Sequence, residues 1–88
     1  MWLIWTENAW NEYCEWQKGD QKYLDRINLL LKDIQRNYYK GIGKPEPLRG
    51  KLSGWWSRRI DESNRIVYRK FDEKSVIISS CKTHYHEK

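Results

Sequence analysis

Residues 23–34 read YLDRINLLLKDI, and this stretch is the strongest indicator of the fold. Its apolar residues recur at intervals of three and four positions, which is the spacing of one face of an α-helix. The recurring residues are Tyr23, Leu24, Ile27, Leu30, Leu31 and Ile34. Asp25, Lys32 and Gln35 fall on the other side. The pattern predicts an amphipathic helix with one buried face.

The segment before this helix predicts a strand followed by a shorter helix. Residues 2–5 read WLIW, and Thr6 is suited to cap a helix that runs to about Lys18. Gly19 can end that helix and Asp20 can cap the next one. Because the link between them is so short, the two helices are expected to form an antiparallel hairpin.

After the second helix the apolar period changes from helical spacing to two. Glycines and prolines in residues 37–47 predict a loop. The predicted strands are residues 55–60, 65–71 and 75–83. Polar residues at 61–64 and 72–74 provide the turns of an antiparallel meander. The predicted fold is α+β, in the order strand–helix–helix–strand–strand–strand, with an antiparallel sheet packed on the helix hairpin and its other face open.

The size and charge of the chain narrow its functional class. Its 88 residues suffice for one domain over residues 1–88, and six Trp with six Tyr argue against intrinsic disorder. Residues 1–33 contain four Lys/Arg against six Asp/Glu, whereas residues 34–88 contain thirteen against six. A basic half opposite an acidic half indicates a face for a polyanion such as nucleic acid. A basic surface that only aids solubility is the alternative.

The cysteines and apolar segments favour a cytoplasmic protein. Cys14 and Cys81 do not match a disulfide framework or a zinc site, so both thiols are expected to be reduced. The apolar run at residues 2–5 is too short for a signal peptide, and no run approaches the ~20 residues that cross a bilayer. We expect no membrane contact.

The residues that carry chemistry begin in the segment 44–60, which reads KPEPLRGKLSGWWSRRI. Glu46 lies between two prolines, which restrict the backbone and favour an extended conformation. The cations that follow are Arg49, Lys51, Arg58, Arg59 and Arg65. A stiffly held carboxylate among cations suits a site that acts on a phosphodiester, although a structural turn on a basic surface has the same residues.

Strand parity leaves one question about these cations open. Side chains alternate across a strand, so Arg58 and Arg59 must face opposite sides of the sheet. Parity alone does not say which of them faces the open side. Both flank the same short turn as Arg65, so the three are expected to lie close together.

The last residues add two histidines. On a strand His84 and His86 would point the same way, and with Glu87 they could loosely hold a metal ion. A role in proton transfer fits one of them better, because imidazole titrates near neutral pH.

These residue types match the metal-free cleavage of RNA. A base removes the proton of a 2′-hydroxyl, which attacks the adjacent phosphorus, and an acid protonates the departing 5′-oxygen; such help contributes ~10²–10⁴-fold. Glu46 fits the base and His84 the acid, with Arg65 and Arg59 stabilising the phosphoryl charge. Tyr85 could stack on a nucleobase. No cofactor is required.

Three segments resemble the YoeB toxin family of the RelE/ParE toxin superfamily. They are LIWTENAW (residues 3–10), GKPEPLRGKLSGWWSRRIDESNRIVY (43–68) and CKTHY (81–85). The resemblance implies a bacterial type II toxin that cuts messenger RNA in the ribosomal A site. It also implies a YefM/Phd-type antitoxin as partner, and possible homodimers.

The resemblance also implies a role for individual residues. The family's general base falls on Glu46, its phosphate-stabilising arginine on Arg65 and its general acid on His84, with the adjacent tyrosine at Tyr85. Supporting cations fall on Arg49 and Arg59. The residues expected to contact RNA are Lys44, Arg49, Lys51 and Arg58.

Two other functions fit the fold. A non-catalytic module that binds nucleic acid or the ribosome would keep the basic face without cleaving. A toxin of the superfamily branch that poisons DNA gyrase is the other, but the pairing of Glu46 with His84 argues against that branch.

Overall fold

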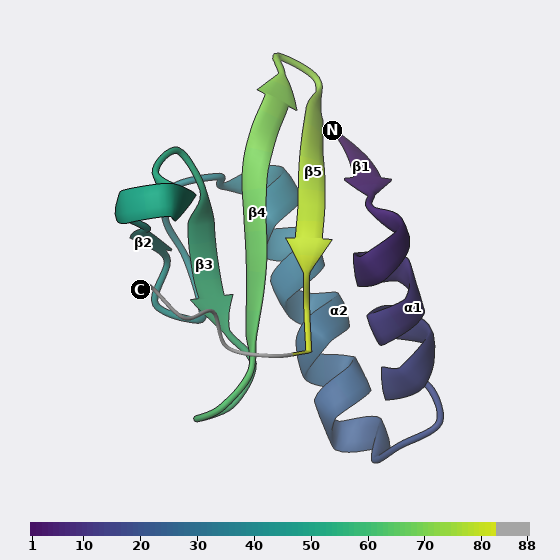
Figure 1. Cartoon of the computed structure of the whole chain (residues 1–88). Helices are drawn as coiled ribbons and strands as arrows, with labels where there is room; N and C mark the ends of the chain where they lie inside the picture. The colour runs from purple at the N-terminus through teal and green to yellow at the C-terminus, as the bar shows by residue number, and fades with distance from the viewer. Residues whose placement is uncertain (83–88) are drawn as a thin grey trace.

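The computed structural model of the chain describes residues 1–82, which form one sheet and two long helices (Figure 1). The elements are β1 (Trp2–Trp5), α1 (Glu7–Trp16), α2 (Gln21–Arg36), β2 (Glu46–Pro47), the 3-10 helix η1 (Gly50–Leu52), β3 (Trp56–Arg59), β4 (Arg65–Asp72) and β5 (Ser75–Ser80). The predicted α+β class is confirmed, as is the predicted order of the two helices and four longer strands. The short strand β2 is an addition inside the segment predicted to be a loop.

The strand order across the described sheet is β1–β5–β4–β3–β2. Pairing is antiparallel from β5 to β2, but β1 runs parallel to β5, so the prediction of a wholly antiparallel sheet is wrong at this edge. No tight turn joins these two strands, so the packing of α1 decides their direction. Thr6 N donates to Ile78 O at 3.1 Å, which places the start of α1 against the end of β5.

Both predicted helix caps form as hydrogen bonds. Thr6 Oγ1 accepts from Ala9 N at 3.0 Å at the start of α1. Asp20 Oδ1 accepts from Lys22 N at 2.9 Å at the start of α2. Each cap satisfies a backbone N–H that lacks a partner within its helix.

The predicted helix hairpin is confirmed by contacts between α1 and α2. Tyr13 on α1 donates its hydroxyl to Asn28 Oδ1 on α2 at 2.6 Å. The rings of Trp16 and Tyr23 lie with their centroids 5.7 Å apart. Neither helix has the length and apolar character that crossing a bilayer requires, among the residues described.

The core lies between α2 and one face of the sheet. The predicted apolar face of α2 is buried there, with Ile27, Leu30 and Ile34 fully inaccessible, whereas Leu29 is 56% exposed. The sheet contributes Ile66, Tyr68, Val76 and Ile78. Burying each large aliphatic side chain contributes roughly 1.5–3 kcal/mol, so this contact is the main source of stability.

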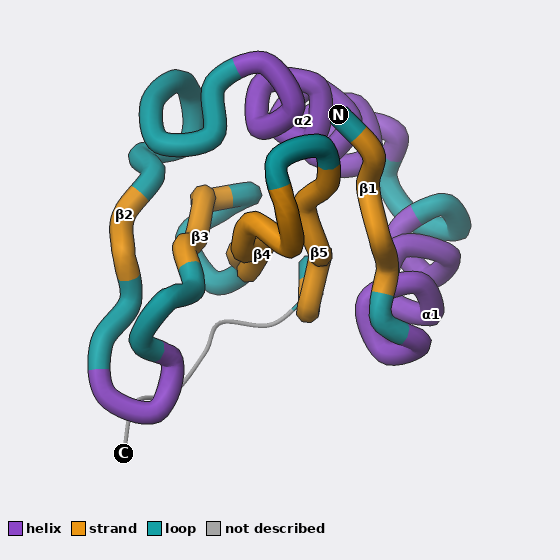
Figure 2. Tube along the Cα trace, turned by 90° about the horizontal axis from the view of Figure 1, so that it is seen from above, coloured by secondary structure: helices purple, strands orange, loops and turns teal. Residues whose placement is uncertain are grey.

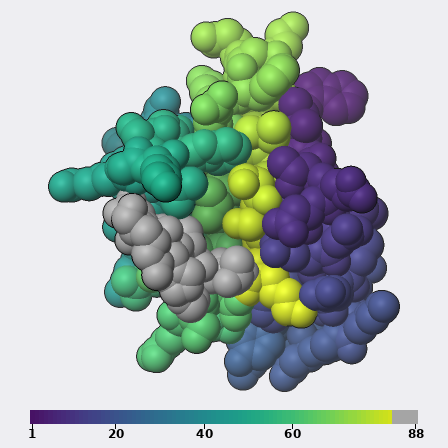
Figure 3. Space-filling model, viewed as in Figure 1, coloured from purple at the N-terminus to yellow at the C-terminus, as the bar shows by residue number. Residues whose placement is uncertain are grey.

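The opposite face of the sheet has no helix of the described residues over β3 and β4. Figure 2 shows α2 on one side of the sheet, α1 beside the β1 edge, and η1 projecting on the side away from α2. In the space-filling view, β5 lies between the segment around η1 and the segment of β1 and α1 (Figure 3). The prediction of one covered face and one open face agrees with this arrangement.

Candidate active site

The strand register decides which charged residues share the uncovered face. Residues directly paired in an antiparallel sheet project to the same face. Glu46 pairs with Ser57, and Arg59 pairs with Arg65. Glu46, Arg59 and Arg65 therefore lie on the face away from α2. We call this the open face and define it by Glu46, Trp55, Ser57, Arg59, Arg65, Val67 and Arg69.

Glu46 lies on an extended segment that is anchored on both sides to β3. Arg59 N donates to Gly43 O at 2.7 Å before it, and Leu48 N donates to the carbonyl of Trp55 at 2.8 Å after it. The prolines on either side of Glu46 have no N–H to contribute, so these two bonds hold the segment. The expected extended conformation is confirmed by β2, and the Glu46 side chain is exposed.

Lys44 turns the chain into this segment. Its φ of 52° lies in the left-handed region, where a residue with a Cβ costs on the order of 1 kcal/mol. Such strain persists only where the surroundings impose it. Here the neighbouring Gly43 is fixed against β3 by its hydrogen bond, which leaves Lys44 to make the bend toward β2.

Arg59 and Arg65 form a directly opposed cationic pair at one end of the open face. Like charges opposite one another destabilise a strand pair, and a bound anion such as a phosphate relieves that repulsion. The turn between them is held by Asp61, whose Oδ1 accepts from Ser63 N at 2.8 Å and Asn64 N at 2.7 Å. Burial alone would raise the pKa of Asp61, but these hydrogen bonds outweigh it and lower the pKa.

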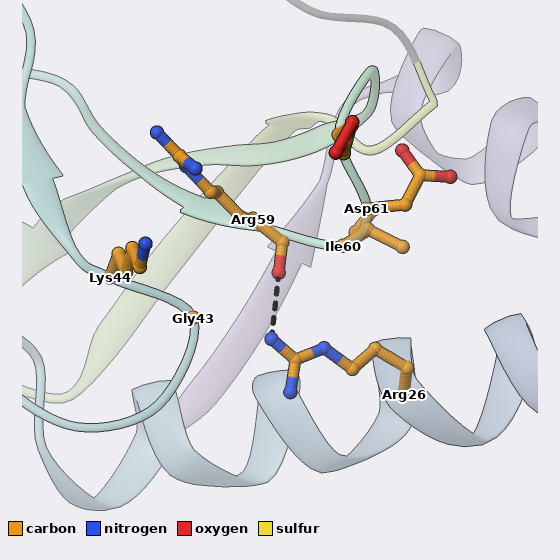
Figure 4. A pocket seen from close by; sticks show the side chains of 7 residues that line it. Arg26, Gly43, Lys44, Arg59, Ile60 and Asp61 are labelled. Carbon is orange, nitrogen blue, oxygen red and sulfur yellow. Dashed lines mark hydrogen bonds between the residues drawn. The ribbon is translucent and has the colours of Figure 1, made fainter.

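A hollow of about 350 Å³ borders Arg59 (Figure 4). Arg26 of α2 donates to the backbone carbonyl of Arg59 at 3.2 Å, while the Arg59 side chain points away from Arg26. The lining residues are Arg26, Gly43, Lys44, Arg59, Ile60, Asp61 and Glu62. Because carboxylates and cations share the lining, the hollow is not a uniform phosphate site. Its contacts instead fix the backbone from which Arg59 extends.

Arg58 lies in the core, and the prediction that it contacts RNA is wrong. Its side chain is 0% exposed and is ion-paired with Asp33 on α2. Arg58 Nε donates to the Tyr68 hydroxyl at 3.1 Å. The remaining donors reach the carbonyls of Asn37, Tyr38, Lys40 and Ile42. The guanidinium is thus occupied by the loop after α2, because β3 parity turns it toward α2.

The sequence did contain a signal of the structural role of Arg58, namely two glycines in the loop after α2. A Cβ at Gly41 would lie 1.8 Å from Asp33 Oδ2, and a Cβ at Gly43 would lie 2.6 Å from Leu30 Cδ2. Both glycines have positive φ. The loop can therefore close over Arg58 only where side chains are absent.

The other basic residues expected to contact RNA are on the surface. Arg49 directly precedes η1 and Lys51 lies within it, and both are exposed. The segment of η1 projects on the side of the sheet away from α2 (Figure 2). Lys44 is also exposed, two residues before Glu46. These three cations surround the segment that carries Glu46.

The predicted acid His84 and the predicted stacking residue Tyr85 lie outside the described residues, as do His86 and Glu87. The last described strand, β5, ends at Ser80, which pairs with Val67 of the open face. Within residues 1–82 no three His, Cys, Asp or Glu side chains are grouped so that they could hold a metal ion.

Comparisons by sequence and by structure both find bacterial YoeB toxins. The chain is 48% identical to toxin YoeB of Escherichia coli K12 over 83 residues, covering 94% of this chain and 98% of that protein. Its fold is similar to the YoeB/ParE toxin from Agrobacterium tumefaciens, with a TM-score of 0.91, 40% identity and coverage of 97% and 100%.

Two solved structures of YoeB from Staphylococcus aureus also match. The heterotetrameric YoeB–YefM toxin–antitoxin complex matches with a TM-score of 0.85 and 43% identity, covering 94% of this chain and 95% of the toxin. The YoeB dimer matches with a TM-score of 0.87 and 42% identity, covering 97% and 98%. The family model described as "YoeB-like toxin of bacterial type II toxin-antitoxin system" matches residues 5–85. With almost its whole length matched, the chain belongs to the YoeB-like toxins of bacterial type II toxin–antitoxin systems.

Proposed function

We propose that the chain is a metal-independent endoribonuclease that cuts messenger RNA in the ribosomal A site and so inhibits translation. The observation that supports this most is the placement of Glu46, Arg59 and Arg65 from three neighbouring strands on one face. No α-helix of the described residues lies over that face (Figure 2). Glu46 and Arg59 are exposed on it, so an RNA strand can reach these two side chains, whereas Ser57 and Val67 of the same face are buried.

Glu46 acts as the general base in this proposal. Its carboxylate takes the proton of a 2′-hydroxyl, and the oxygen attacks the adjacent phosphorus. The bond from phosphorus to the 5′-oxygen then breaks, leaving a 2′,3′-cyclic phosphate on one fragment and a 5′-hydroxyl on the other. Proton transfer by a positioned side chain contributes ~10²–10⁴-fold to such a reaction. The anchored backbone of β2 supplies that positioning.

Arg65 and Arg59 stabilise the charge that gathers on the phosphoryl oxygens. Preorganised cationic donors of this kind contribute on the order of several kcal/mol. Arg65 is half-buried and Arg59 is exposed, so the first is the more rigidly held of the two. The exposed cations Lys44, Arg49 and Lys51 extend the contact with the RNA backbone.

His84 is the proposed acid that protonates the 5′-oxygen, and Tyr85 is the proposed partner of a nucleobase. Both assignments rest on the residue types and agree with the family pattern CKTHY at residues 81–85. Arg58 has no part in the mechanism, because it is enclosed in the core.

The proposed partners follow from the relatives. The S. aureus toxin forms a heterotetrameric complex with YefM, so we propose a YefM-type antitoxin for this chain as well. A homodimer is proposed on the same ground. The expected partners are therefore the ribosome, messenger RNA, the antitoxin and a second copy of the chain.

Mapping of 5′ ends in a translating bacterial extract tests the cleavage. The parent is expected to create new 5′ ends within translated messages, whereas Glu46→Gln, Arg65→Ala and His84→Gln are expected to lose them by ~10²-fold or more. Each variant should keep the parent's thermal melting temperature and should still sediment with ribosomes.

Glu73→Gln is the matched control, because Glu73 is an exposed carboxylate in the turn between β4 and β5. It should cleave like the parent. Retention of full cleavage by Glu46→Gln would refute the site. Ribosome binding by the parent without any cut would instead favour the non-catalytic binding module.

A further inference from the structure

The open face continues past the cationic pair to an aromatic residue covered by an arginine. The outward residues of β4 are Arg65, Val67 and Arg69, in that order along the strand. The guanidinium carbon of Arg69 lies over the Trp55 ring, 5.1 Å from its centroid. The pair therefore forms one surface made of an indole and a guanidinium.

The backbone that carries Trp55 is fixed at both of its polar groups. Trp55 N donates to Leu52 O at 3.0 Å, and the carbonyl of Trp55 accepts from Leu48 N at 2.8 Å. Arg69 is held within β4 by its pairing with Ile77 on β5. The Trp55 ring is half-buried and Arg69 is exposed, so the surface is rigid at its base and accessible at its rim. Rigid aromatic rings and guanidinium planes are the surfaces on which proteins stack nucleobases.

The position of this pair relative to Glu46 matters for RNA. Along β3 and the residue before it, the cationic pair, the Glu46–Ser57 row and Trp55 follow one another at steps of two residues, or about 6.6 Å each. Glu46 thus lies between a phosphate site on one side and the Trp55–Arg69 pair on the other. In a ribonucleotide, likewise, the 2′-hydroxyl lies between the 3′-phosphate and the base, because the sugar carries all three.

The geometry points to a base-stacking subsite at Trp55 and Arg69, which holds the base of the nucleotide that supplies the attacking 2′-hydroxyl. The inference rests on the proposed function for the identity of that nucleotide. The subsite binds the nucleotide on the 5′ side of the cut and orients its sugar toward Glu46.

The test uses ribosomes programmed with messages that carry an intact or an abasic nucleotide on the 5′ side of the mapped cut. The parent is expected to cleave the intact message about tenfold faster or more. Trp55→Ala should lower cleavage of the intact message to near the abasic level and leave cleavage of the abasic message almost unchanged. Trp55→Phe should restore most of the difference, because it retains a ring.

Two controls match the substitutions in residue type. Trp2→Ala removes a tryptophan that is 75% exposed on β1, at the other edge of the sheet, and should leave the base dependence intact. Lys70→Gln removes a cation that is next to Arg69 on β4 but projects from the opposite face, and it should leave the base dependence intact. Arg69→Gln should reduce the base dependence. Equal losses for Trp55→Ala on both messages would overturn the subsite, as would no loss on either.

A binding measurement separates this inference from the nuclease itself. In the Glu46→Gln background, affinity for the same two programmed ribosomes is measured with Trp55 present and with Trp55→Ala. Base-dependent affinity that disappears with Trp55→Ala supports the subsite independently of the rate of cleavage. Cleavage by the parent without base-dependent affinity or rate refutes the subsite and leaves the nuclease standing.

Discussion

Arg58 and Arg59 are adjacent cations that the fold uses in opposite ways. Arg59 projects from the open face beside Arg65, whereas Arg58 is enclosed and ion-paired with Asp33. A buried guanidinium is tolerated only where its donors are satisfied and its charge is opposed. The loop carbonyls after α2 meet the first need and Asp33 meets the second. Arg58 is therefore a structural residue that fixes the loop leading to Glu46.

Asp33→Asn is expected to lower the free energy of unfolding by about 3 kcal/mol, because it leaves the Arg58 charge buried without a counter-charge. The measurement is urea unfolding at neutral pH. Asp25→Asn is the control, since Asp25 is an exposed carboxylate on α2 and should change stability little. Equal stability of the two variants would contradict the structural role of the pair.

The Asp33 carboxylate should make the stability of the folded chain sensitive to acid. Burial alone would raise the pKa of Asp33, but hydrogen bonds from Arg58 and from Ile42 N outweigh it and lower the pKa below its ordinary 3.8. The resulting stabilisation is fully present above about pH 4 and is lost as the pH falls through the folded-state pKa. The stability difference between parent and Asp33→Asn should therefore shrink below pH 4 in an acid titration of urea unfolding. A difference that stays constant down to pH 2 would refute the assignment.

Among the secondary-structure elements, the start of α1 is linked to β5 by the side chain of Thr6. Thr6 Oγ1 accepts from Ala9 N and donates to Ser79 O at 3.1 Å. One hydroxyl thus caps the helix and satisfies a carbonyl where β5 approaches its end. It also ties the residue after β1 to the end of β5, as the parallel direction of β1 requires.

Thr6→Val is expected to destabilise the chain by roughly 1–3 kcal/mol, since it removes a helix cap and one further hydrogen bond while keeping the shape of the side chain. Thermal or urea unfolding measures the change. Thr6→Ser retains the hydroxyl and should lose much less. A Thr6→Val protein as stable as Thr6→Ser would show that the hydroxyl contributes nothing.

Across the whole molecule, the uneven charge of the sequence becomes an uneven surface. Residues 1–33, with their acidic excess, form β1, α1 and most of α2, whereas the basic remainder forms the strands of the open face. In Figure 1, β1 and α1 of the acidic part lie at one edge of the sheet, β2 and β3 of the basic part lie toward the other edge, and α2 lies behind the sheet. We expect this separation to direct a polyanion to β2, β3 and β4.

Ribosome binding is expected to weaken steeply with added salt, because contacts between cations and phosphates release counterions. Arg59→Ala and Arg65→Ala should each reduce the slope of log affinity against log salt by about 1, whereas Lys70→Gln should leave it nearly unchanged. Measuring the affinity for ribosomes at salt concentrations from about 50 to about 300 mM checks this, with the affinity at about 100 mM as the reference value. Equal slopes for all four proteins would place the phosphate contacts elsewhere.

Local patterns were enough to predict the two helices, their caps and the meander of β3, β4 and β5. Periodicity and capping depend on residues within one or two turns, so they can be recognised without a partner segment. The extended, proline-flanked Glu46 could be predicted for the same reason. The two residues of β2 are too few to show a period, and their pairing with β3 was not predicted.

How distant segments of the chain lie relative to one another could not be predicted from local patterns and is seen only in the folded structure. Whether Arg58 or Arg59 faces the solvent depends on which side of β3 packs against α2, and a shift of one residue would exchange them. The parallel pairing of β1 with β5 depends likewise on how α1 docks, across nearly the full length of the described chain. The same dependence placed Trp55 under Arg69, because no pattern in either strand specifies its neighbour across the sheet.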